Sequence, residues 1–283
     1  IVGEAVVPGE REPAAQVLVL AALAEGESRI HNAPPAIAPL VQVLGKLGVG
    51  IALQQDGLVV RGCGLRGFRA PDGALELDGL GDTGLLVLGL LAGQDFATPV
   101  KADEGRERCG KLLELLAPMG VSAVRESGEI LVVGGMELTG IAHREVEMDA
   151  ALKLALCIAG LCARGHTTLL EPAKHRDQVV RLLRQRQIEV ERHKQEGSDH
   201  YLVSVEGRQN LEPCAMEIPG DVRLAYPLVA AALALKGSDL SIRRVAIHPG
   251  KRALLDTLRH MGAPITLEED GDGTSCLQVR SGV

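Results

Sequence analysis

The entry to the first predicted helix combines charged residues that could bind or repel an anion. The stretch VPGEREPAAQVLVLAALAEGESRI, residues 7–30, reads as a helix, a turn and a strand, and the helix is entered through Glu10, Arg11, Glu12 and Pro13. A helix N-terminus attracts phosphate through its free amides and its dipole. Here Arg11 adds positive charge, whereas the carboxylate of Glu12 competes for the same amides. The alternative is a solvated helix entry in which Glu12 is a cap and Pro13 needs no amide donor.

A second loop-to-helix junction offers a similar combination. Lys251 and Arg252 follow His248 and Pro249 at a predicted helix start, where an anion could bind. A solvated, exposed turn is the alternative there. No histidine has metal-ligand spacing, and no Ser-His-Asp grouping or nucleotide-binding glycine loop can be argued from the sequence. Small-anion binding is therefore the one chemistry that these two junctions leave open beside the solvated alternatives.

The composition excludes several classes of function. The 283 residues carry a formal net charge of −7, and only 1% of them are aromatic, so we expect neither a general attraction to nucleic acid nor a base-stacking surface. No apolar run approaches a membrane span, and no signal segment opens the chain. The six cysteines include no C-x-x-C pair and are expected to be free thiols. The sequence thus predicts a cytoplasmic protein without a nucleic-acid or membrane partner.

Four segments of the chain repeat one pattern. Each has an apolar helix, a turn glycine and a strand, and the turn glycines recur about every 70 residues, at Gly26, Gly93, Gly165 and Gly237. A second, amphipathic helix and two strands follow each time. The glycines predicted to end the second helices are Gly48, Gly120 and Gly262, and the third segment lacks one at Ile188. The pattern predicts an α/β fold made of α+β repeats, in which the repeating unit is βαβαββ.

These repeats, with four sequence stretches, resemble the enolpyruvyl transferase family and, within it, the EPSP synthase (3-phosphoshikimate 1-carboxyvinyltransferase) family. The stretches are VPGEREPAAQVLVLAALAEGESRI, GDTGLLVLGLLAGQDF with ADEGRERCGKLLELLAPMG, ALKLALCIAGLCARGHTTLLEPAKHRDQ, and IPGDVRLAYPLVAAALALKGSDLSIRRVAIHPGKRALLDTLRHMGAPI. The family has six βαβαββ units in two three-unit domains with the active site between them. The resemblance covers about the first four units.

The resemblance implies a domain division and an assembly. Residues 14–210 are expected to form a complete three-unit domain. Residues 1–13 and 211–283 are expected to form a partial second domain, in which the N-terminal strand joins the fourth unit. Large apolar patches are uncommon on monomers. The uncovered apolar faces of this partial domain therefore predict self-association.

The resemblance also implies a reaction, in which an enolpyruvyl group passes from phosphoenolpyruvate to shikimate-3-phosphate in aromatic amino acid biosynthesis, without a metal or organic cofactor. The family's acid–base residues lie in its fifth and sixth units, so no catalytic residue is expected among these 283. Either Arg106 or Arg108 would take the place of the arginine that binds phosphoenolpyruvate. By motif position, the expected ligands of the small anionic substrates are Arg11, Gly84, Arg106, Arg108, Lys153, Arg176 and Lys251.

Most polar ligand positions of the family are nevertheless substituted. Glu12 and Gln16 replace a serine and an arginine of the first motif, P-G-D-K-S-x-S-x-R. Leu85 and Leu88 replace the threonine and arginine of G-N-x-G-T-x-x-R, and Ala151 replaces the glutamine of S-x-Q-x-K-S. Glycines and apolar positions remain.

Three hypotheses follow from these substitutions. The first is an EPSP synthase-like protein that is incomplete or degenerate, and inactive as this chain. The second is a non-catalytic scaffold or anion-binding module descended from the family. The third is a different anionic substrate, for which Arg11, Arg176 and Lys251 would be the best ligands.

Overall fold

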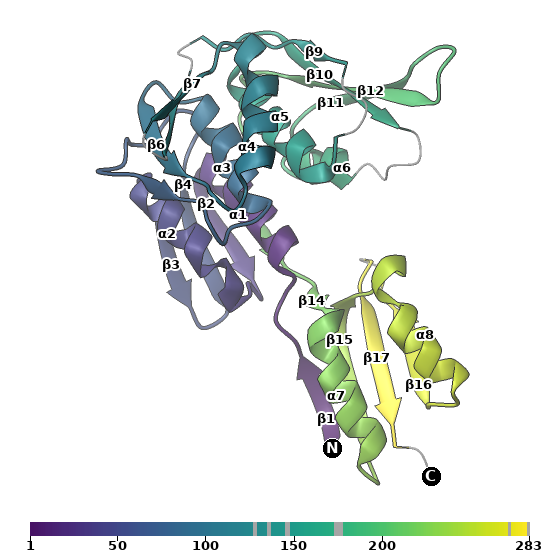
Figure 1. The fold of residues 1–283 in the computed structure, drawn as a ribbon. Coiled ribbons are helices and arrows are strands. Elements are labelled where there is room, and N and C mark those ends of the chain that lie inside the picture. Colours follow the sequence, from purple (N-terminus) through teal and green to yellow (C-terminus); the bar gives the residue numbers. More distant parts are fainter. Residues whose placement is uncertain (127–128, 135–136, 145–147, 173–177, 271–272, 282–283) are drawn as a thin grey trace.

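The chain folds into two bodies of unequal size joined by two crossing segments (Figure 1). The computed structural model describes residues 1–126, 129–134, 137–144, 148–172, 178–270 and 273–281. The larger body contains three four-stranded sheets, and the smaller body contains one five-stranded sheet. Buried apolar side chains form two separate clusters that match these bodies, one within residues 14–218 and one made of Val7 and residues within 222–279.

Each sheet of the larger body carries the two helices of one repeat unit, and the first sheet includes one strand, β13 (Ala215–Glu217), from beyond the third unit. The first has the strand order β13, β2 (Glu25–His31), β4 (Gly57–Cys63), β3 (Gly50–Gln54), with helices α1 (Arg11–Leu23) and α2 (Ala38–Lys46). The second has the order β5 (Leu75–Glu76), β6 (Ala97–Lys101), β8 (Glu129–Val133), β7 (Ser122–Glu126), with α3 (Thr83–Ala92) and α4 (Arg106–Leu116). The third has the order β9 (Ala142–His143), β10 (His166–Pro172), β12 (His200–Glu206), β11 (Val190–Lys194), with α5 (Ala150–Cys162) and α6 (Gln178–Arg184). The predicted βαβαββ repeat is therefore confirmed.

The first helix of each unit forms the centre of the larger body. Nine of the 13 residues of α1, all ten of α3 and 11 of the 13 of α5 are buried. A helix that is apolar all round must be covered on every side, and α3 contacts both α1 and α5. Because the three helices pack on one another, their N-termini are brought together, which determines where a site can form.

The packing of α3 on α5 depends on Gly89. A Cβ at this position would lie 2.4 Å from the carbonyl oxygen of Ala155, so the two helices would have to move apart. We expect Gly89→Ala to lower the free energy of unfolding by about 1–3 kcal/mol, measured by urea denaturation. The control is Gly45→Ala on α2, where nothing lies within 4 Å of the added Cβ. An equal loss of stability in both variants would contradict the close-packing argument.

The smaller body is built from the fourth unit and the N-terminal strand. Its helices are α7 (Val222–Ala234) and α8 (Ala253–His260), and its strands are β1 (Val2–Val6), β14 (Gly220–Asp221), β15 (Asp239–Ala246), β16 (Ile265–Glu269) and β17 (Ser275–Arg280). β1 pairs in parallel with β15, and β13 pairs in parallel with β2. The first strand of the chain thus lies in the last sheet, and a strand made after the third unit completes the first sheet.

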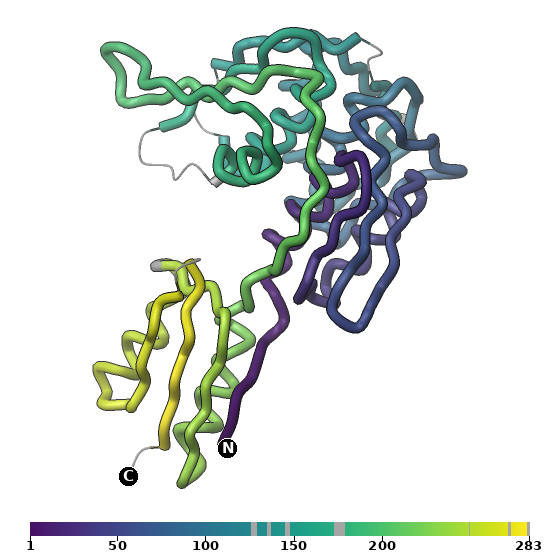
Figure 2. Tube along the Cα trace, turned by 180° about the vertical axis from the view of Figure 1, so that it is seen from behind, coloured from purple at the N-terminus to yellow at the C-terminus, as the bar shows by residue number. Residues whose placement is uncertain are grey.

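The two crossing segments lie side by side between the bodies (Figure 2), where Gly9 bridges Gly220. Asn32, at φ 56°, donates from Nδ2 to the carbonyl oxygens of Val7 and Ile218 at 3.1 and 2.9 Å. A Cβ at Gly9 would lie 2.5 Å from the carbonyl oxygen of Asn32. One side chain therefore ties both segments together at a place that has room only for glycine.

Residues 211–218 pack with the larger body. Leu211 and Ile218 belong to its apolar cluster, and β13 belongs to its first sheet. The boundary at residue 210 expected from the sequence precedes this contact. We therefore propose that the second body resumes after Ile218, because the chain first leaves the larger core there.

The left-handed residues that end the second helices include one that is not glycine. Gly48, Gly120 and Gly262 have φ of 91°, 109° and 91°, as predicted. In the third unit the equivalent residue is Gln187, at φ 60°. The substituted position is thus Gln187 rather than Ile188, which is buried.

Helix α7 is covered less than its counterparts in the larger body. Only four of its 13 residues are buried. Leu224 within the helix and Leu235 directly after it are 48% and 52% exposed. These exposed leucines are compatible with the uncovered apolar face expected for the partial domain. Self-association through it stays a prediction.

Candidate functional site

The N-termini of α1, α3 and α5 meet at one pocket of about 320 Å³, which we call the anion pocket. Its lining residues are Glu12, Gln16, Asp82, Thr83, Leu86, Arg108, Asp149, Ala150 and Ala151. Free backbone amides and the positive ends of helix dipoles converge at such a place. The fold therefore builds a geometry suited to an anion.

The side chains of this pocket oppose that geometry. Arg108 of α4 forms ion pairs with Asp82 and with Asp149, at N–O distances of 2.6 and 2.5 Å. Asp149 also caps α5, because its Oδ1 accepts from the amides of Ala151 and Leu152 at 3.0 Å each. The guanidinium of Arg108 and two of the amides at the start of α5 are thus occupied by the protein's own carboxylates, whereas the starts of α1 and α3 have no side-chain cap.

The side chains that line the anion pocket give it a formal charge of −2, from three carboxylates and one guanidinium. Glu12, Asp82 and Asp149 supply three carboxylates, and Arg108 is the one cation among the lining residues of this pocket. Asp82 and Asp149 flank Arg108 from the starts of two different helices. Their contact with Arg108 was not predicted from the sequence. The signal was present as an acidic residue directly before each helix, in GDTG and MDAA.

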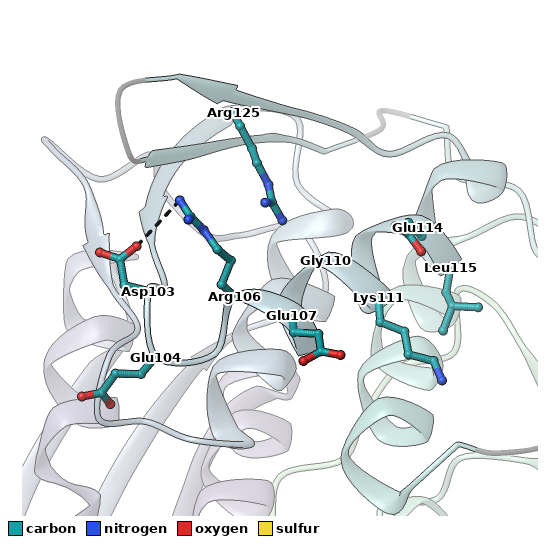
Figure 3. A pocket seen from close by; sticks show the side chains of 9 residues that line it. All are labelled: Asp103, Glu104, Arg106, Glu107, Gly110, Lys111, Glu114, Leu115 and Arg125. Atoms are coloured by element: carbon teal, nitrogen blue, oxygen red, sulfur yellow. Dashed lines mark ion pairs between the residues drawn. The ribbon is translucent and has the colours of Figure 1, made fainter.

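Arg106 and Arg108 lie on different sides of α4. Figure 3 shows the ion pair of Arg106 with Asp103, at 3.9 Å, and the Arg106 side chain is 58% exposed. It lines an open pocket of about 890 Å³ with Glu107, Lys111 and other charged residues. Of the two arginines, the structure brings Arg108 alone to the meeting point of the helices.

Arg11 and Gly84 occupy the neighbourhood of the anion pocket without lining it. The Arg11 guanidinium donates to the carbonyl oxygen of Gly79, in the loop before α3, at 2.5 Å. Gly84, in the first turn of α3, lines an adjoining pocket of about 230 Å³, which also contains Arg108 and Cys109. Arg11 thus braces the loop that positions α3.

Lys153 is buried within the third unit. Its side chain is 6% exposed, and its Nζ lies 2.9 Å from Oε1 of Glu171, whose side chain is 4% exposed. The other oxygen of Glu171 accepts from Nε of Arg192 at 3.2 Å, and that guanidinium lies 3.7 Å from the ring centroid of Tyr201. Lys153 therefore takes part in an internal charge network.

Lys251 and Arg176 complete the predicted ligands. Nζ of Lys251 lies 2.8 Å from Oε2 of Glu10, so it joins the smaller body to the entry of α1. Arg176 lies outside the described residues, as do His175 and Asp177.

Asp221 is the remaining conspicuous acid near the crossing. Burial raises the pKa of Asp221, but the hydrogen bonds and charge of Arg223 outweigh burial and bring this pKa below its ordinary value. Asp221 caps α7 by accepting from the amide of Arg223 at 3.0 Å. Its role in the structure is that of a helix cap.

Other chemistries lack support in the described ranges. Burial raises the pKa of Cys157 to about 12 and that of Cys162 to about 11, so both thiols are protonated at neutral pH. Among the described residues, no group of three or more His, Cys, Asp or Glu could hold a metal ion. None of the helices in that part of the chain is long and apolar enough to cross a bilayer.

Comparisons with known proteins agree with this architecture. The family model of EPSP synthase (3-phosphoshikimate 1-carboxyvinyltransferase) matches residues 1–278. The 3-phosphoshikimate 1-carboxyvinyltransferase of Alkalilimnicola ehrlichii is 37% identical over 97% of this chain, and that of Bacillus licheniformis is 32% identical over 96%. An EPSP synthase structure from Acinetobacter baumannii has a TM-score of 0.79 at 26% identity and covers 99% of this chain.

The chain matches only part of each relative. It spans 63% of the length of the Alkalilimnicola protein and 64% of the Bacillus protein and of the Acinetobacter structure. Within that span, the family model, the curated relatives and the fold all agree. This chain belongs to the EPSP synthase family.

Proposed function

We propose that this protein is an EPSP synthase-like member of its family that retains the fold and the anion pocket but has no enolpyruvyl transferase activity as this chain. The observation that carries the proposal is the double ion pair of Arg108 with Asp82 and Asp149. A substrate phosphate would have to displace one of these carboxylates before it could reach the guanidinium. Glu12, on the opposite helix, would repel it.

A substrate phosphate would have to compete with these carboxylates for Arg108. A charge-assisted hydrogen bond contributes about 1.5–3 kcal/mol when it replaces contacts with water. Here a phosphate would replace a carboxylate that is already in place, so the gain from the new contact is largely cancelled. The converging amides offer less than in an open helix start, because Asp149 accepts from two of them. The pocket therefore keeps the converging helix starts of the family, while its guanidinium and two of its amides, which could bind an anion, are held by carboxylates. We still expect the protein to be cytoplasmic.

A second candidate is the transferase reaction that the relatives' names describe, with phosphoenolpyruvate and shikimate-3-phosphate as the expected substrates. It is favoured by the convergence of three helix N-termini and by Arg108 at that point. Under this alternative, substrate binding would open the Arg108 ion pairs.

Calorimetry and a phosphate-release assay separate the two candidates. We expect titration of the chain with shikimate-3-phosphate, alone and with millimolar phosphoenolpyruvate, to give heats equal to dilution, and no phosphate release above a protein-free blank. The Acinetobacter EPSP synthase, run in parallel, serves as the positive control. Saturable heat with release of phosphate would establish the transferase, whereas saturable heat alone would establish an anion-binding module.

A further inference from the structure

A separate pocket of about 160 Å³ lies at the junction of the two bodies, and we call it the junction pocket. Its walls come from α1, α6, β13 and the crossing, and from the end of β15 and residues 273–274 in the smaller body. Val17, Leu182, Met216 and Ala246 supply apolar surface from these elements. Gln16 is shared with the anion pocket, and the other lining residues are not.

The polar group that distinguishes the junction pocket is Glu10. This residue is only 5% exposed. Its Oε2 accepts from Nζ of Lys251 at 2.8 Å, whereas its Oε1 has no hydrogen-bond partner among the described residues. A buried carboxylate oxygen without a donor costs about 1–3 kcal/mol or more. The native contacts thus leave one strong acceptor unused on a residue that lines a cavity of mixed apolar and polar surface.

The charges around Glu10 restrict what kind of donor fits. Lys251 already balances its charge at close range, and Glu217, the other lining carboxylate, is balanced by Arg244 at 2.9 Å. Arg181 also lines the pocket, so a cationic ligand would meet a like charge there, and a ligand carboxylate would meet Glu10 and Glu217. A neutral hydroxyl can donate to Oε1 without leaving a charge buried in the cavity.

We propose that the junction pocket binds a small neutral alcohol. Its ring or branched carbon body packs against the apolar lining residues, and its hydroxyl donates to Oε1 of Glu10. Such pockets combine mostly apolar lining with a few placed polar groups. Because the lining comes from both bodies, a bound molecule contacts both and restrains their relative rotation. The proposal is independent of the activity proposed above, since it uses neither Arg108 nor Glu12.

The probe for this site is cyclohexanol, with cyclohexanone as a matched molecule that has the same ring but no donor. Binding to the full chain is followed by ligand-observed NMR titration. We expect cyclohexanol to bind with a dissociation constant of about 1 mM, a strength within reach of so small a ligand. Cyclohexanone should bind at least tenfold more weakly. Equal binding of the two probes, or no binding of either, would overturn the proposal.

Two variants test the location. Glu10→Gln, which removes the charge of the acceptor, should weaken cyclohexanol binding about tenfold. Leu182→Trp, at a half-buried position on α6, should fill the cavity and abolish binding while leaving Glu10 in place. The control is Glu12→Gln, two residues away in the anion pocket, which should bind as the native chain does. If Glu10→Gln and Leu182→Trp, both folded by circular dichroism, retained native affinity, the assignment to the junction pocket would be wrong.

Discussion

Changing Glu12→Ser, Gln16→Arg and Asp82→Asn in one chain should create affinity for shikimate-3-phosphate where the native chain has none. The three substitutions change the formal charge of the anion pocket from −2 to +1, counting Asp149 and Arg108 as unchanged. They also remove one of the two carboxylates that hold Arg108. One edge of the Arg108 guanidinium is then free to bind phosphate. The Gln16→Arg change adds a second guanidinium from α1.

The size of the effect can be bounded. Hydrogen bonds to charged groups contribute about 1.5–3 kcal/mol each, so two new arginine contacts predict a gain of at least about 3 kcal/mol, or roughly 100-fold in the dissociation constant. Calorimetry at low and high salt provides the measurement. The gain should shrink as salt rises, because the contacts are made near the surface of the pocket.

The matched control carries the same charge changes away from the pocket. Glu114→Ser, Gln55→Arg and Asp72→Asn lie at exposed positions and alter the net charge by the same amount. This chain should bind shikimate-3-phosphate no better than the native protein. A comparable gain in the control would show that overall charge, and not the arrangement of the anion pocket, determines the affinity.

Glu171→Gln should be among the most destabilising single changes in the larger body. It leaves the ammonium of Lys153 buried without its carboxylate and also removes the partner of Arg192. Breaking a buried ion pair from one side costs about 3–5 kcal/mol. Chemical denaturation of the variant gives the measurement, with the shift in midpoint read at constant slope.

An exposed pair of the same length tests the role of burial. Lys101 and Glu76 are also 2.9 Å apart, but their side chains are 43% and 56% exposed. Glu76→Gln should cost less than about 1 kcal/mol. Adding Lys153→Met to Glu171→Gln should restore part of the lost stability, since the buried ammonium is removed. Equal costs for Glu76→Gln and Glu171→Gln would mean that Lys153 is hydrated in solution.

Much of the architecture could be predicted because short-range sequence patterns determine its helices and turns. Apolar helices followed by a turn glycine indicated α1, α3 and α5, and the cap glycines marked the ends of the second helices. The residue that replaces the third cap glycine was predicted at Ile188, whereas the structure has it at Gln187. Gln187 adopts a left-handed conformation, which is uncommon for a residue with a side chain and could not be predicted. The role of β13 could not be predicted, since a three-residue strand has no periodicity of its own.

The site was harder to predict because it depends on which way side chains face. Arg106 and Arg108 are two residues apart, which places them about 200° apart around a helix, and only the packing of α4 decides which one faces inward. Lys153 was predicted as a ligand from its position in a motif. Its pairing with Glu171 links a helix to the strand after it, and such a contact leaves no signature in spacing.

The exchange of β1 and β13 between the two bodies bears on how the chain folds during its synthesis. Val2 of β1 pairs with Asp239, which is made only after three whole repeat units. The first sheet likewise waits for Ala215, which pairs with Arg29. Contacts so distant along the chain slow folding, because long loops must close before they form. Each body is therefore completed by a strand that lies far away along the chain, so neither sheet is complete until both of its distant segments have been made.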